Sequence, residues 1–163
     1  MSEEPIITRA TTHNRLIAAR SALYDAIAGE TDATLGSRMV TPEWTALDIL
    51  RHIGVWNELC TRCLDDWLGS RDWILTFAAE DQFNVEMVAA RAGISLAQAR
   101  AAIELAYTAY EQTLAECRDE HLAEQAPAPW GQMLPRIGLI WFEVEHDMMH
   151  INQMRVALGK AAV

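Results

Sequence analysis

The stretch PRIGLIWFEVEHDMMHINQMRVAL, residues 135–158, has the features of one long helix. Pro135 stands at its start, where proline is tolerated, and Gly159 follows its end, where glycine is favoured. At about 100° per residue, apolar side chains fall on two opposite sides of this helix. The first side carries Ile137, Trp141, Val144, Met148, Ile151 and Leu158, and the second carries Leu139, Phe142 and Met149 with His146 and His150. A helix that is apolar on two sides is usually buried on both, so we expect the histidine pair to lie away from solvent.

Three further long helices are expected from the spacing of apolar residues. They cover residues 8–28, a segment from Thr41 or Thr45 to Gly69, and Ser95 to about Cys117. Thr45 with Asp48, and Ser95 with Gln98, have the spacing of capping boxes. A loop through Gly36 separates the first two helices, and a long connection, residues 70–80, leads into a shorter helix that ends at Arg91-Ala92.

Strand signals are nearly absent, since no segment alternates between apolar and polar residues. Four long helices in 163 residues, of which 51% are hydrophobic, predict an all-α four-helix bundle. A short extra helix is expected in the long connection between the second and third long helices. We expect residues 1–163 to form a single domain.

Charge and composition exclude several classes of partner. The formal net charge of −10 and the absence of a basic run argue against nucleic acid and against anionic membrane surfaces. No segment reaches the roughly 20 apolar residues of a membrane span, and the acidic start of the chain does not resemble a signal peptide. Three cysteines make a disulfide scaffold improbable, so a cytoplasmic location is expected.

His146 and His150 are the strongest candidates for metal ligands. Residues four apart on a helix share a face, so their imidazoles can reach one ion. His52 lies on an apolar stripe of another helix, beside Ile49 and Trp56, and would supply a third ligand. Three nitrogens leave coordination positions open, as in catalytic centres, and they suit Zn²⁺, Ni²⁺ or Fe²⁺. The alternative is that these are hydrogen-bonded histidines of the core, whereas His13 and His121 are expected at the surface.

Other residues near these histidines allow more than one interpretation. Trp56 follows His52 by one helical turn and can form the wall of a pocket. Glu143 precedes His146 by one turn and can be an outer-shell partner, a fourth ligand or simply a solvated charge. Cys60 and Cys63 have the spacing of a redox or zinc motif but fall within a predicted helix, so we interpret them as buried apolar residues.

Three segments together resemble the DinB-like superfamily, which includes mycothiol-dependent maleylpyruvate isomerases and other thiol-transferase-like proteins. They are EWTALDILRHIGVW at residues 43–56, DQFN at residues 81–84, and the H-x-x-x-H pattern from His146 to His150. The resemblance implies a four-helix bundle that binds a divalent metal through His52, His146 and His150. The residues themselves give no role for the DQFN segment, from which Asn84 is kept as a candidate pocket or outer-shell residue.

The resemblance also implies a class of activity. The first hypothesis is a metal-dependent enzyme that acts on a small electrophile, either as a thiol S-transferase or isomerase or as a hydrolase. A metal-bound water or thiolate would then do the chemistry, with a low-molecular-weight thiol as a cosubstrate in the first case. The alternative is a non-catalytic, ligand-binding or stress-associated bundle with a structural metal or none. The second apolar side of the last helix also makes a homodimer plausible.

Overall fold

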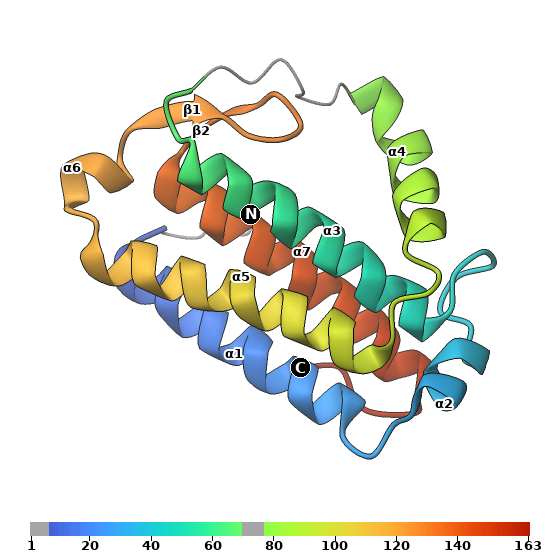
Figure 1. The fold of residues 1–163 in the computed structure, drawn as a ribbon. Helices are drawn as coiled ribbons and strands as arrows, with labels where there is room; N and C mark the ends of the chain where they lie inside the picture. Colours follow the sequence, from blue (N-terminus) through green and yellow to red (C-terminus); the bar gives the residue numbers. More distant parts are fainter. Residues whose placement is uncertain (1–6, 70–76) are drawn as a thin grey trace, which may run out of the picture.

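A computed structural model describes residues 7–69 and 77–163 of the chain. Four long helices form a bundle (Figure 1): α1 (Arg9–Ile27), α3 (Ala46–Asp65), α5 (Leu96–Glu116) and α7 (Arg136–Ala157). Helices α1 and α7 run in one direction and α3 and α5 in the other. Each long helix packs against two others, so that α1, α7, α3 and α5 follow one another around the core. The predicted all-α four-helix bundle is confirmed.

The starts of the long helices follow from their capping residues. Thr45 accepts a hydrogen bond from the backbone of Asp48, whose carboxylate accepts one from the Thr45 backbone, and Ser95 and Gln98 form the same arrangement. Both predicted capping boxes are therefore confirmed, and Thr45 rather than Thr41 precedes α3. The end of α3 was predicted too late, because the backbone leaves the helical conformation at Asp66 and turns before Gly69.

Helix α2 (Asp32–Ser37) occupies the region where a loop was predicted. Thr31 and Thr34 cap its start reciprocally, and Leu35 is fully buried against the bundle. A single large apolar residue within six gives no helical period, so the sequence of this segment did not predict a helix.

The region before α7 also contains structure that was expected to be a loop. Helix α6 (Asp119–Leu122) leads into an antiparallel hairpin of β1 (Gln125–Pro127) and β2 (Met133–Pro135), in which Ala126 lies opposite Leu134. These two strands form the only sheet in residues 7–69 and 77–163, which agrees with the predicted near absence of strands, but the hairpin itself was not predicted. Strands of three residues are too short to show an alternating pattern.

Helix α4 (Phe77–Ala90) is the extra helix expected between the second and third long helices. It begins earlier than predicted, because residues 77–80 are helical rather than part of the connection. The rest of that predicted connection, residues 70–76, lies outside the described residues. In Figure 1, α4 stands beside the bundle rather than within its ring of long helices.

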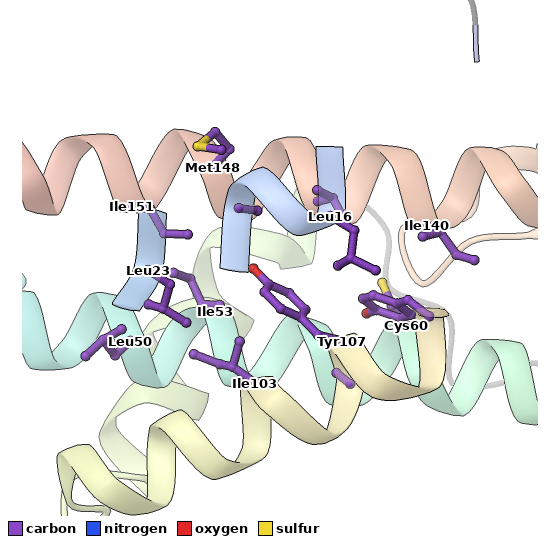
Figure 2. Close-up of a cluster of buried hydrophobic side chains, with 14 of the residues drawn as sticks. Leu16, Leu23, Leu50, Ile53, Cys60, Ile103, Tyr107, Ile140, Met148 and Ile151 are labelled. Atoms are coloured by element: carbon purple, nitrogen blue, oxygen red, sulfur yellow. The ribbon is translucent and has the colours of Figure 1, made fainter. Parts of the chain in front are cut away.

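All four long helices contribute to one core. Figure 2 shows Leu16 and Leu23 of α1 close to Ile53 of α3, Tyr107 of α5 and Ile151 of α7. Burial of an aliphatic side chain contributes about 1.5–3 kcal/mol, so these contacts dominate the stability of the bundle. The two cysteines of α3 are also buried, as predicted. Across residues 7–69 and 77–163, no helix is long and apolar enough to cross a membrane.

The prediction that α7 is buried on both apolar sides was only partly correct. On one side Val144, Met148 and Ile151 are buried, but on the other Phe142 and Met149 are 43% and 49% exposed. Helices α1 and α3 pack against α7 from two directions, and the strip that carries these two side chains faces outward. Whether a second copy of the chain covers this strip stays a prediction.

Candidate metal centre

The structure brings His52 of α3 together with His146 and His150 of α7. The Nε2 atoms of His52 and His146 are 3.1 Å apart, and the nearest ring nitrogens of all three residues lie within 4.8 Å of one another. Ligand nitrogens bound to one Zn²⁺ at about 2.0–2.1 Å must lie within about 4.2 Å of each other. The His52–His146 pair meets this limit, and the three-imidazole donor set fits a divalent transition metal.

The surroundings keep the imidazoles of His52 and His150 uncharged. Burial, followed by repulsion from the other two histidines, lowers the pKa of His52 to about 2. Burial and repulsion from His146 lower the pKa of His150 to about 4. A neutral imidazole has a free lone pair and can ligate a metal, whereas the protonated form cannot. His52 and His150 therefore have the protonation state that a metal ligand requires at neutral pH.

Two carboxylates from α7 lie behind His146, on the side toward the core. His146 Nδ1 is 3.5 Å from Asp147 Oδ1 and 3.9 Å from Glu143 Oε1. Asp147 and Glu143 are 0% and 1% exposed, so the interpretation of Glu143 as a solvated charge was wrong. Burial, with repulsion from Asp147, raises the pKa of Glu143 to about 8, and burial also raises the pKa of Asp147.

Residues of α3 and α5 hold these two carboxylates. The Asn57 amide donates a hydrogen bond of 2.7 Å to Asp147 Oδ2, and the Cys60 thiol donates one of 3.2 Å to Glu143 Oε2. The hydroxyl of Tyr107 also interacts with Asp147. Buried polar groups need such partners, because each one left unsatisfied costs about 1–3 kcal/mol. The network fixes the part of α7 that carries the histidines.

Aromatic rings border the histidines on the side away from the core. The ring centroid of Trp44 lies 5.0 Å from that of His52, and Trp56 lies 6.1 Å from both His146 and Trp130 of the hairpin. Trp56 also donates a hydrogen bond of 2.9 Å to Asn84 of α4. Trp56 therefore lies beside these histidines, and Asn84 contacts Trp56.

Two arginines of α7, which could in principle bind a carboxylate, do not contribute to the site. Arg155 donates to the backbone carbonyls of Ala161 and Ala22, and Arg136 pairs with Glu124, so the contacts of both guanidiniums are away from the histidines. His13 and His121 are exposed, as expected.

Sequence reasoning missed Asp147, Asn57 and Gln153. Gln153 Oε1 lies 2.8 Å from His150 Nδ1, one turn along α7. Spacing alone could have suggested Gln153, which is three residues from His150. It could not have shown that Asp147 is buried, because charged residues on helices are normally solvated.

A model of the DinB superfamily matches residues 15–154. The chain belongs to this superfamily. The match covers most of the chain and both helices that supply the histidines, so the resemblance noted in the sequence is confirmed. Among curated proteins, none matches the chain.

Two solved structures show the same fold as this DinB-superfamily chain. They are crystal structures of a mycothiol-dependent maleylpyruvate isomerase and of a histidine-to-alanine mutant of that isomerase, each with a TM-score of 0.71. Sequence identity is 12% and 11%, and the alignments cover 96% of this chain. At that identity the likeness shows the fold alone. The chain spans only 62% of the length of the isomerase.

Proposed function

We propose that His52, His146 and His150 hold a divalent metal, and that the chain is an enzyme acting on a small electrophile. The observation that carries this proposal is the convergence of three imidazoles from α3 and α7, with two Nε2 atoms 3.1 Å apart. Residues 94 positions apart in the sequence meet here, so the arrangement is not a product of local helix spacing. Zn²⁺, Ni²⁺ and Fe²⁺ all suit this donor set.

Accessibility favours a catalytic centre over a structural one. The His146 side chain is 26% exposed, so the group of histidines is not sealed in the core. A structural zinc site is usually closed by four protein ligands, whereas a catalytic site leaves a position for water or substrate. Three imidazoles with access from one side have the second arrangement.

The surrounding residues fit a small, uncharged or weakly polar reactant. A divalent metal bound here would lower the pKa of a thiol or water and polarise an electrophilic carbonyl. The ring of Trp56 lies beside His146 and is itself in contact with Trp130, which favours a compact or planar substrate and excludes water from part of the site. We propose that the reaction is a thiol transfer or a thiol-dependent isomerisation, with hydrolysis as the alternative reaction at the same site.

Fold similarity to a mycothiol-dependent isomerase supports a low-molecular-weight thiol as the cosubstrate. The isomerase has additional chain that this protein does not match, so its substrate need not be shared. A cytoplasmic location, which supplies such thiols, is part of the same proposal.

Turnover of the zinc-loaded full chain tests this function. Maleylpyruvate and simple electrophiles such as activated aryl halides and esters are offered with glutathione, cysteine or mycothiol, and without any thiol. We expect turnover that falls at least about 100-fold in His52→Ala and is unchanged in His13→Ala, which replaces an exposed histidine. Turnover only with thiol identifies a transferase or isomerase, and turnover without thiol identifies a hydrolase.

Two results would contradict the proposal. The first is turnover that survives His52→Ala, which would separate the activity from the histidines. The second is zinc binding that raises the melting temperature while no reactant is converted, which would favour the non-catalytic bundle with a structural metal.

A further inference from the structure

Each of the two α7 histidines has an oxygen beside its Nδ1 atom. For His150 this is Gln153 Oε1 at 2.8 Å, and for His146 it is Asp147 Oδ1 at 3.5 Å. The Nε2 atom of His146 faces the opposite way, toward His52 Nε2. The two nitrogens of the His146 ring therefore have different surroundings, a carboxylate for one and the candidate metal centre for the other.

The orientation of Asp147 is itself fixed. The Nδ2 group of Asn57 has two hydrogens, one donated to the Ile53 carbonyl at 3.0 Å and the other to Asp147 Oδ2 at 2.7 Å. Asn57 and Asp147 are both 0% exposed, so water does not compete for these bonds. With Oδ2 occupied by Asn57, Oδ1 is the oxygen that Asp147 presents to His146.

We propose that Asp147 and Gln153 are positioning residues that set the tautomers of His146 and His150. A neutral imidazole carries a single N–H, and only its other nitrogen has a lone pair for a metal. An acceptor oxygen beside Nδ1 holds the proton there and leaves Nε2 free. This inference rests on the proposed metal centre, but the tautomers exist with or without the metal and can be measured separately.

The two positioning residues should differ in how strongly each one holds the tautomer of its histidine. Asp147 is fully buried, so water cannot replace its Oδ1 atom 3.5 Å from His146 Nδ1. Gln153 is exposed and neutral, so water can replace it. Loss of an outer-shell partner typically costs 10–100-fold in metal affinity, and we assign the upper part of that range to Asp147.

The first variant is Asp147→Asn in the full chain. The Asn57 donor requires an oxygen opposite it, so the new amide must turn its NH₂ group toward His146 Nδ1. That group donates rather than accepts, and the His146 proton should move to Nε2. We expect imidazole ¹⁵N NMR of the metal-free variant to show this switch, and zinc affinity measured by chelator competition to fall about 30–100-fold.

Glu145→Gln is the matched control for charge. Glu145 is also next to His146 and loses the same charge on substitution, but it pairs with Arg15 at the surface. We expect its His146 tautomer to stay as in the wild type and its zinc affinity to change by less than about threefold. Equal effects of Asp147→Asn and Glu145→Gln on both readouts would overturn the role of Asp147, since only general charge would then matter.

The second variant, Gln153→Leu, carries little folding risk because the residue is exposed. We expect His150 to populate both tautomers and zinc affinity to fall up to about tenfold, with no change in Gln112→Leu, an exposed glutamine on α5. An unchanged His150 tautomer would overturn the role of Gln153. If the wild type bound no zinc, the proposed metal centre would fail, while the ¹⁵N spectra would still decide both positioning roles.

Discussion

The pKa values of His52 and His150 depend on the residues that surround their imidazoles. Both are neutral at physiological pH because burial disfavours the charged imidazolium and the neighbouring rings add repulsion. The helical spacing of His146 and His150, and the apolar stripe around His52, predicted this grouping from the sequence. The buried state of Glu143 and Asp147 was not predictable, because it depends on Asn57 and Cys60 lying on the facing helix.

The pKa of His150 leads to a prediction for the metal-free protein. Its pKa is about 4 when folded, against roughly 6.5 when unfolded. Between these values the unfolded chain binds a proton that the folded chain does not, so stability falls as the pH is lowered. We therefore measure the free energy of unfolding in urea with a chelator present. Between pH 7 and pH 5 we expect it to fall by about 1–2 kcal/mol more in the wild type than in His150→Gln.

Glu143 has the opposite effect on the pH dependence of stability. Its raised pKa makes the folded chain bind a proton that the unfolded chain releases. Glu143 is present in both proteins, so the difference between them reports on His150 and on its repulsion of His52. Identical pH dependence of the wild type and His150→Gln would contradict the depressed pKa.

Among the helices and strands, the elements that begin with a capping box could be located from the sequence. Thr45 with Asp48, and Ser95 with Gln98, gave the starts of α3 and α5 correctly. Helix α2 and the β1–β2 hairpin were missed because each is short and is stabilised by contacts with the bundle, such as the burial of Leu35 and Leu134. Their local sequence contains too few residues to establish a period.

The attachment of α4 to the bundle gives a prediction at the level of elements. Trp56 donates to Asn84, and Arg91 of the following turn pairs with Glu58, whose side chain is largely exposed. Trp56→Phe keeps an aromatic side chain but removes the indole N–H that donates to Asn84. This should reduce the free energy that holds α4 on the bundle by about 1 kcal/mol. We expect amide hydrogen exchange in residues 81–90 to accelerate about fivefold.

Trp130→Phe is the matched control for α4. Trp130 donates to Gln132 within the hairpin loop, so its replacement leaves the Trp56–Asn84 bond in place. Unchanged exchange of α4 in Trp56→Phe, or an equal acceleration in Trp130→Phe, would show that this hydrogen bond does not hold α4.

At the scale of the whole molecule, the bundle brings α3 and α7 together although they are far apart in the sequence. Packing of α1 and α5 completes the ring of helices (Figure 1). Phe83 of α4 and Trp130 of the hairpin contact Trp56, which lies beside the histidines. The fold class was predictable because four long helices with regularly spaced apolar residues can pack together in only a few ways. The aromatic border was not, because Phe83 and Trp130 lie on segments whose placement depends on the whole fold.

Metal content of the full chain, purified without a histidine tag and measured by mass spectrometry, tests the central claim most directly. The wild type, His146→Ala and His121→Ala are compared, the last of which replaces an exposed histidine. We predict close to one divalent transition-metal ion per chain in the wild type and His121→Ala, and little in His146→Ala. Equal trace amounts in all three proteins would contradict the metal centre and make these histidines ordinary residues of the bundle.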